Sequence, residues 1–195
     1  DIFQNSTLPA EEMGKEKGVI VGEIEMVEDN PQEHISDLFS ELLYGDQPAG
    51  WNIAGTRETV RAMTREKMAE YRQKHYVASE TAVIVAGNVD EARVWDIVAL
   101  AFQDAPQGEK TGKVKVRDSQ KTPAVKTEFK ETQQTHLMLG FRSFTVYDER
   151  QKVLRLLSVI LGGGMSSRLF ERIREKMGAG YYIGMAPQFF TDHGF

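Results

Sequence analysis

The N-terminal part of the chain carries two carboxylates at a spacing that could serve a metal site. Glu16 and Glu23 stand seven residues apart, and the apolar periodicity of residues 8–26 predicts a helix across both. Seven residues make about two helical turns, so both side chains project from one face, roughly 10 Å apart along the axis. One carboxylate could ligate a metal ion while the other orients that ligand. A solvated acidic face explains the same spacing, because Glu25 and Glu28 are close by.

A second pair, Arg174 and Tyr181, brackets a Gly-rich turn in the C-terminal part of the chain. The arginine could donate to a peptide carbonyl, and the tyrosine hydroxyl could donate to a developing oxyanion. A structural role explains them equally, with Arg174 compensating a helix C-terminus and Tyr181 packing in a strand. The pair is therefore a candidate substrate-binding site with a structural alternative.

The histidines do not form a zinc motif among themselves. A zinc peptidase places two histidines one helical turn apart with a glutamate as the base. No two of the four histidines in this chain lie within five residues of each other. We expect surface or packing roles for all of them: His34, His75, His136 and His193.

The glycine run at residues 162–164 precedes a predicted helix, a place where phosphate could be held. However, the segment before it has helical rather than strand periodicity, and no Gly-Lys-Ser/Thr sequence follows. We therefore interpret this run as a tight turn between helices.

The composition of the 195 residues is that of an ordinary globular chain, with 41% hydrophobic and 27% charged residues. The net charge is −5 and the charges are interspersed, which gives no basic stripe for nucleic acid or an anionic membrane. The absence of cysteine excludes disulfides and thiol nucleophiles. No apolar run reaches the ~18 residues of a transmembrane helix. These features leave the compartment open, because cytosolic and periplasmic proteins can both lack cysteine.

Hydrophobic periodicity predicts an α+β fold in which helices pack in two layers on a mainly antiparallel sheet. Polar, Gly- and Lys-rich composition over residues 104–122 predicts a linker, with a domain boundary near Gly112. The predicted helices cover residues 8–26, 31–43, 64–75, 90–102, 148–161 and 166–177. The predicted strands cover residues 81–87, 124–130, 136–141 and 181–190.

Several segments, in order, resemble the pitrilysin, insulysin and mitochondrial processing peptidase family of inverzincin zinc peptidases, especially its bacterial processing-protease-like members. The resemblance covers nearly the whole chain. One difference concerns Trp51, which stands where relatives often carry a more polar residue. The segments that carry the resemblance include KEKGVIVGEIEM at 15–26, IAGTRETVR at 53–61, VIVAGNV at 83–89 and LGGGMSSRLFERIREK at 161–176.

The resemblance implies a role for each candidate residue. In that family an inverted His-x-x-Glu-His motif supplies two zinc ligands and the general base, and a downstream glutamate is the third ligand. Glu23 matches this metal ligand, and Glu16 matches the supporting catalytic carboxylate one heptad earlier. Arg174 and Tyr181 match a substrate-binding arginine and tyrosine. The resemblance therefore favours the functional interpretation of both pairs.

The His-x-x-Glu-His motif itself is absent from the chain, and we expect it upstream in a longer parent protein. Residues 1–112 would be the C-terminal part of the zinc-site domain, and residues 113–195 the N-terminal part of a homologous substrate-binding domain. The expected function is that of a fragment of a zinc metalloendopeptidase acting on peptides. Zinc would bind the complete protein, and the chain alone would be inactive. A homodimer or a paired family subunit is a possible partner.

Two alternatives to the enzyme follow from the same residues. The family contains noncatalytic members that scaffold an active partner, and the upstream motif would decide between the two roles. A peptide-binding α+β module outside the family is the other alternative.

Overall fold

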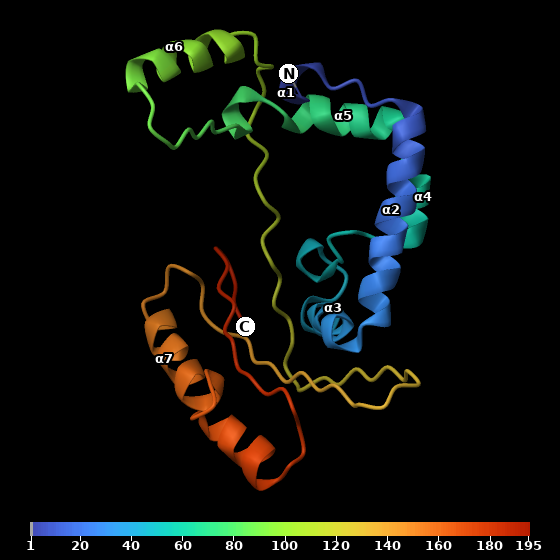
Figure 1. Cartoon of the computed structure of the whole chain (residues 1–195), viewed down its shortest axis with the longest axis vertical. Coiled ribbons are helices and arrows are strands. Elements are labelled where there is room, and N and C mark those ends of the chain that lie inside the picture. Colours follow the sequence, from blue (N-terminus) through green and yellow to red (C-terminus); the bar gives the residue numbers. More distant parts are fainter. Residues whose placement is uncertain (1) are drawn as a thin grey trace. The chain divides into compact units, whose positions relative to one another are not determined.

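The computed structural model describes residues 2–195, and helices are its regular elements (Figure 1). The predicted helices are confirmed, with ends that differ by a few residues. The helices, in chain order, are α1 (Ile2–Asn5), α2 (Ala10–Asp29), α3 (Pro31–Tyr44), the 3₁₀ turn η1 (Pro48–Gly50), α4 (Arg57–Ala62), α5 (Arg65–His75), the 3₁₀ turn η2 (Ala78–Glu80), α6 (Glu91–Phe102), α7 (Gln151–Gly162) and the π-helix η3 (Phe170–Lys176).

Side-chain caps fix where three of these helices begin. Thr64 accepts a hydrogen bond from the Lys67 amide at the start of α5, and Asp90 accepts one from the Arg93 amide at the start of α6. Such caps satisfy amides that have no partner within the helix. Thr56 forms a reciprocal capping box at the start of α4, a helix that the sequence periodicity did not predict.

The prediction of an α+β fold is wrong for this structure. Across residues 2–195 there is no strand and no sheet, and the one β-bridge joins Phe189 to Gly194. The predicted strand at 81–87 has no regular secondary structure and no neighbouring strand, and Ile84 within it is 88% exposed. The strand was predicted from a run of β-branched residues. Such a run shows only that the side chains suit a pleated surface. A strand also requires a ladder of hydrogen bonds to a partner, and these segments lack one here.

The chain divides into two compact units. Unit 1 contains the residues up to Asp37 and Trp51–Val114, and unit 2 contains Leu38–Gly50 and Lys115–Phe195. The limits between them fall at three places: within α3, directly after η1, and within the predicted linker.

In unit 1, α4 lies beside α2 (Figure 1), and arginines of α5 hold the segment that precedes α2. Arg65 donates to the Leu8 and Thr7 carbonyls at 2.8 and 3.0 Å, and Arg72 donates to the Phe3 carbonyl at 2.6 Å. The Phe3 ring packs against other aromatic rings of the unit at centroid distances of 5.6 Å. These contacts anchor the start of α2, which carries the candidate metal residues.

In unit 2 the core forms around the C-terminal turns of α3. Phe39, Leu43 and Tyr44 are buried there and pack against Phe195, whose ring centroid lies 5.4 Å from that of Phe39. Burial raises the pKa of Tyr44 to about 12, because the charged phenolate is poorly solvated there. The space is full, since a Cβ added at Gly140 would lie 2.1 Å from the Phe39 ring.

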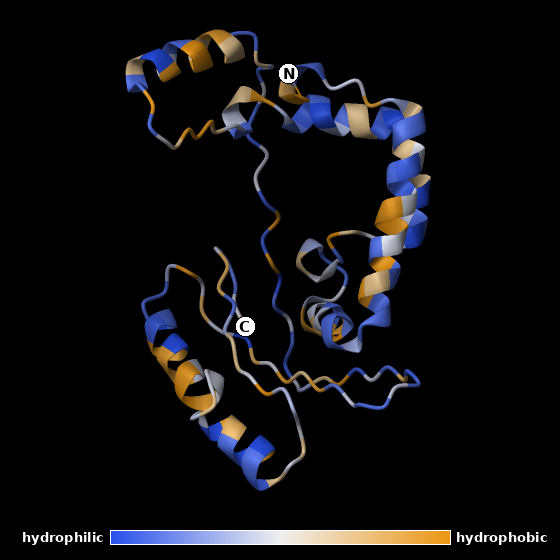
Figure 2. Ribbon diagram, viewed as in Figure 1, coloured by the Kyte–Doolittle hydropathy of each residue, from blue (hydrophilic) through white to orange (hydrophobic). Residues whose placement is uncertain are grey.

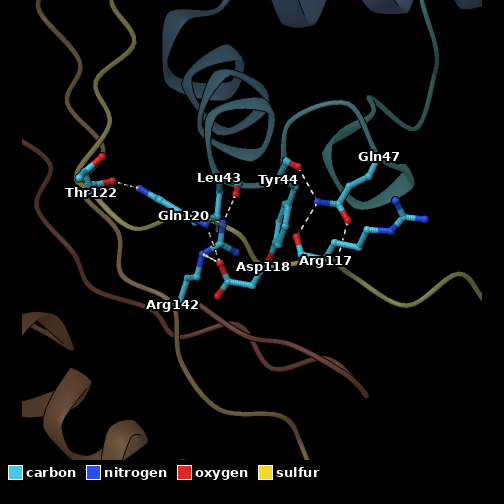
Figure 3. Close-up of polar contacts among 8 residues, drawn as sticks. All are labelled: Leu43, Tyr44, Gln47, Arg117, Asp118, Gln120, Thr122 and Arg142. Atoms are coloured by element: carbon cyan, nitrogen blue, oxygen red, sulfur yellow. Dashed lines mark hydrogen bonds and ion pairs between the residues drawn. The ribbon is translucent and has the colours of Figure 1, made fainter.

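Polar side chains close the C-terminal end of α3 (Figure 3). The Gln47 amide donates to the Arg117 carbonyl at 3.1 Å and accepts from the Arg117 amide at 2.8 Å. Arg142 donates to the Leu43 carbonyl and pairs with Asp118 at 2.9 Å. Carbonyls at a helix C-terminus have no partner within the helix, so this cluster satisfies them and ties residues 117–118 to α3.

Several apolar side chains of α7 remain exposed, and hydrophobic residues colour much of its length in Figure 2. They include Val153 at 68% and Leu156 at 62%. Within residues 2–195, however, no helix combines the length and hydrophobicity that crossing a membrane requires.

Candidate functional site

Both candidate metal-site carboxylates lie on α2 and are exposed. Glu16 and Glu23 are within the helix Ala10–Asp29, as predicted, with an axial separation of about 10 Å. Proline at the N-cap and acidic residues in the first turn suit the start of this helix. Among the described residues, neither carboxylate has a hydrogen-bond or ion-pair partner.

The other four glutamates of α2 are all ion-paired. This pairing distinguishes Glu16 and Glu23 from their neighbours, since the helix carries six glutamates in all. The four paired glutamates and their cations are Glu11 and Glu12 with Lys15, and Glu25 and Glu28 with Arg57. The two candidate carboxylates therefore stay available to an outside ligand.

Arg57 of α4 fixes the C-terminal half of α2. Its guanidinium donates to Glu28 at 3.0 Å and to Glu25 at 3.3 Å. The hydrogen bond with Glu28 raises the pKa of Arg57 further above its usual range. One helical turn of α2 is thus held against α4 immediately after Glu23. Lys17 adds a hydrogen bond to the Arg61 carbonyl at 3.1 Å.

The histidines are dispersed, in agreement with their spacing in the sequence. His75 contacts the Thr111 hydroxyl at 3.2 Å, and His193 contacts Asp192 at 2.9 Å. Across residues 2–195 no three histidine, cysteine, aspartate or glutamate side chains gather as a metal site would require.

Zinc in proteins is bound by about four ligands, in catalytic sites by three from the protein. Glu23 has the chemistry of one such ligand, an exposed carboxylate oxygen donor on a rigid helix. The described residues provide no second ligand near it. By themselves they do not fit a zinc site.

The structure brings Arg174 and Tyr181 together. An Arg174 guanidinium nitrogen donates to the Tyr181 carbonyl at 3.0 Å, and the guanidinium carbon lies 4.4 Å from the centroid of the Tyr181 ring. The Phe170 ring contacts the same guanidinium at 5.0 Å. An arginine between two aromatic faces is stabilised by cation–π attraction.

A glycine positions this pair. Gly178 has a φ of +60°, a left-handed conformation that other residues rarely adopt, and it reverses the chain after η3. Its amide donates to the Arg174 carbonyl at 3.2 Å. The reversal brings Tyr181 back over Arg174 and leaves Tyr181 79% exposed. Arg174 lies in the last turn of η3 and contacts Tyr181, and Tyr181 does not pack within a strand.

The glycine run before η3 makes a close backbone contact. A Cβ at Gly162 would lie 2.4 Å from the Met185 amide nitrogen. No larger residue fits that approach. Bends and turns at residues 163–167, between α7 and η3, agree with the predicted turn between helices.

Two features of the sites were not predicted from the sequence. One is the Arg57 connection between α4 and α2, which joins segments 29 residues apart and has no local signal. The other is the polar closure of α3 by Gln47 and Arg142, which has no local signal.

Comparisons with known proteins identify relatives of the whole chain. A family model described as the peptidase M16 inactive domain matches residues 62–195. An uncharacterized zinc protease of Rickettsia felis is 38% identical over 196 residues, and those of Streptomyces coelicolor and Bacillus subtilis are 34% and 35% identical. All of this chain aligns with each of them, and it covers 47%, 44% and 47% of their respective lengths. The chain thus spans about half the length of the curated relatives it matches.

Solved structures share the fold at low sequence identity. A peptidase M16 inactive domain from Pseudomonas fluorescens has a TM-score of 0.78 and 19% identity, with 99% of this chain and 47% of that chain covered. A protease from Helicobacter pylori has a TM-score of 0.73 and 18% identity, with 95% and 46% covered. At these identities the likeness concerns the fold alone.

Proposed function

The chain belongs to the peptidase M16 family, and on that premise we propose that its complete parent protein is a zinc-dependent endopeptidase acting on peptides or unfolded protein segments. The family assignment agrees with the resemblance to pitrilysin, insulysin and mitochondrial processing peptidase. Relatives that align with the whole chain are named zinc proteases. The match over residues 62–195 is to a domain described as inactive, so we expect no hydrolysis by this chain alone.

The observation that carries the proposal is the contrast among the glutamates of α2. Glu16 and Glu23 have no partner within the described residues, while every other glutamate of that helix is ion-paired. Two unpaired carboxylates on one face fit a ligand and the group that orients it.

Each of the four candidate residues would have its own role in peptide hydrolysis. Zinc, when bound in the complete protein, supplies a Lewis acid that polarises the scissile carbonyl. Glu23 would hold the metal and Glu16 would orient the ligand set. Arg174 would hold the substrate backbone through its remaining donors, and the Tyr181 hydroxyl would donate to the oxygen on which negative charge develops.

The test of the metal residues uses the complete parent protein. Zinc binding is measured by titration calorimetry for the wild type, Glu23→Gln and Glu16→Gln, with Glu11→Gln as a matched control on the same helix. We expect Glu23→Gln to abolish tight binding and Glu16→Gln to weaken it roughly 10- to 100-fold. Wild-type zinc affinity in Glu23→Gln would show that Glu23 is a solvated acid.

The test of the substrate pair measures hydrolysis of an unfolded protein by the same parent. Tyr181→Phe removes only a hydroxyl, and we expect kcat to fall by roughly 10²- to 10³-fold if that hydroxyl stabilises the oxyanion. Arg174→Lys keeps the positive charge but loses the planar guanidinium with its several donors. Substrate binding should therefore weaken and KM should rise. Wild-type kinetics in both variants would assign the pair a structural role.

The description of the matched domain as inactive supports a second candidate, a noncatalytic scaffold that binds peptide. A parent protein of this kind would bind no zinc and cleave nothing alone, yet would raise the hydrolysis rate of an active family member mixed with it.

A further inference from the structure

The helix that carries Arg174 has a rare geometry. The element η3 is a π-helix, in which hydrogen bonds join residues five apart rather than four. The Met177 amide accordingly donates to the Arg172 carbonyl at 3.2 Å. Because π-helical turns occur frequently at functional sites, the geometry of η3 directs attention to the side chains that surround Arg174.

An ion pair within η3 suits this geometry. Lys176 Nζ lies 2.6 Å from Glu171 Oε1, five residues earlier in the chain. In an α-helix, residues five apart point about 140° away from each other around the axis, so an α-helix would separate the two charges. Their hydrogen bond lowers the pKa of Glu171 and raises the pKa of Lys176. The pair therefore favours the π-helical backbone that presents Arg174.

Phe170, the first residue of η3, packs against Arg174 within the same helix. The guanidinium carbon of Arg174 lies 5.0 Å from the centroid of the Phe170 ring and 4.4 Å from that of the Tyr181 ring. An aromatic ring attracts a cation through its face, whereas the N–H donors of a guanidinium lie in its own plane. Within residues 2–195 this guanidinium makes one hydrogen bond, to the Tyr181 carbonyl. The two rings thus hold Arg174 and leave its other donors for an oxygen of a ligand.

We propose that Phe170 is a positioning residue, whose ring holds the Arg174 guanidinium beside Tyr181 in the orientation that binds the substrate backbone. This role of Phe170 rests on the proposed function, in which Arg174 binds substrate. Without the ring, the long arginine side chain would sample other rotamers, and peptide binding would have to order it at an entropic cost. Substrate affinity would then fall, while the chemical step would be unchanged.

The first test is a double-mutant cycle in the complete parent protein, with hydrolysis of an unfolded protein as the assay. We expect Phe170→Leu, which keeps an apolar side chain, to raise KM by roughly 2- to 5-fold, the effect of one cation–π contact, and to leave kcat within about twofold. Phe170→Tyr keeps the ring face and should restore the wild-type KM. In an Arg174→Gln background, Phe170→Leu should have no further effect, because the ring acts through the guanidinium.

Phe189→Leu is the matched control. The Phe189 ring lies 4.8 Å from the guanidinium carbon of Arg155 in the same unit, so this variant removes the same kind of contact from a different arginine. It should keep the wild-type KM. If Phe170→Leu raised KM equally with and without the Arg174 guanidinium, Phe170 would support the fold alone and the proposal would be overturned. A wild-type KM in Phe170→Leu would also overturn it.

The second test follows Arg174 directly and does not depend on hydrolysis. In the parent protein made with isotope-labelled arginine, the side-chain NMR signal of Arg174 is assigned by its loss in Arg174→Gln. We expect ring currents to shift this signal upfield, and the shift to decrease in Phe170→Leu but not in Phe189→Leu, which should instead move the Arg155 signal. An Arg174 signal that does not respond to loss of the Phe170 ring would overturn the proposal in any parent protein. The expected response in a parent protein that cleaves nothing would support the positioning of Arg174 and contradict the peptidase function alone.

Discussion

The three glycines of α2 provide a direct stability test of the fold. Gly14, Gly18 and Gly22 recur every fourth residue and are exposed. A Cβ added at any of them would meet no atom within 4 Å, so alanine fits without rearrangement. None of the three has a positive φ. Replacing them with alanine should therefore change only the intrinsic preference for helix.

The expected change in the free energy of unfolding follows from helix propensity. Glycine in a helix interior is about 0.8–1.0 kcal/mol less favourable than alanine, mainly because it loses more backbone freedom on folding. Since the added methyl groups would touch nothing, the effects should add. We expect the triple alanine variant to raise the free energy of unfolding of unit 1 by about 2–3 kcal/mol.

The chain contains a probe that is specific for this unit. Both tryptophans, Trp51 and Trp95, belong to unit 1 with α2. Tryptophan fluorescence during urea unfolding therefore follows unit 1, while far-ultraviolet circular dichroism follows both units. The variant should shift the urea midpoint upward and leave the slope unchanged.

A control glycine in the same unit should behave in the opposite way. A Cβ at Gly108 would lie 2.7 Å from a Val77 methyl carbon, and Val77 is 2% exposed. Overpacking of this kind costs about 1–3 kcal/mol, so Gly108→Ala should lower the midpoint. If the α2 alanines also lowered it, the glycine face of α2 would be packed against other atoms and our description of this helix would be refuted.

Three further predictions concern unit 2. Because burial raises the pKa of Tyr44 to about 12 from 10.0, the folded chain holds the phenolic proton more tightly than the unfolded chain. The free energy of unfolding should therefore fall as pH rises from 10 through 12. In Tyr44→Phe the urea midpoint should fall less over the same pH range. The hydrogen bond from the Arg150 side chain lowers the pKa of Asp148 to about 2 from 3.8, and the Arg150 backbone amide adds to this effect. The stabilising contribution of Asp148 should be complete above the unfolded pKa and lost as pH falls through 2. In Arg150→Gln, carboxyl-carbon NMR should find a higher Asp148 pKa, which stays below 3.8 because the backbone amide remains. Gln47→Ala leaves the Arg117 amide and carbonyl without their protein partner. Because water can replace it, we expect the free energy of unfolding to fall by only about 0.5–1.5 kcal/mol. Hydrogen exchange at the Arg117 amide should become faster, whereas exchange at the wild-type rate would contradict the role of Gln47.

The parts of the fold that depend on near neighbours in sequence were predictable. Thr64 and Asp90 cap their helices as their residue types indicate, because a cap reaches an amide only three residues away. The Arg174 and Tyr181 pair also meets within one turn and a glycine reversal. The strands were predicted wrongly because β-branched composition at residues 81–87 contains no information about a hydrogen-bonding partner.

Contacts between distant segments account for what the sequence did not reveal. Gln47 and Arg117 are separated by 70 residues, and Leu43 and Arg142 by 99. No periodicity or motif connects such positions, so the polar closure of α3 could not be foreseen. The pairing of Arg57 with Glu28, 29 residues away, is similar, and it is this pairing that singles out Glu16 and Glu23.

The packing of Phe39 and Tyr44 against Phe195 and His193 has a consequence for biosynthesis. About 150 residues separate the two sides of this core, and a ribosome adds roughly 5–20 residues per second. The apolar end of α3 is therefore synthesised roughly 8–30 s before its packing partners. During that interval a nascent chain would expose these rings, which makes the α3 segment a natural target for chaperones that hold unfolded polypeptides.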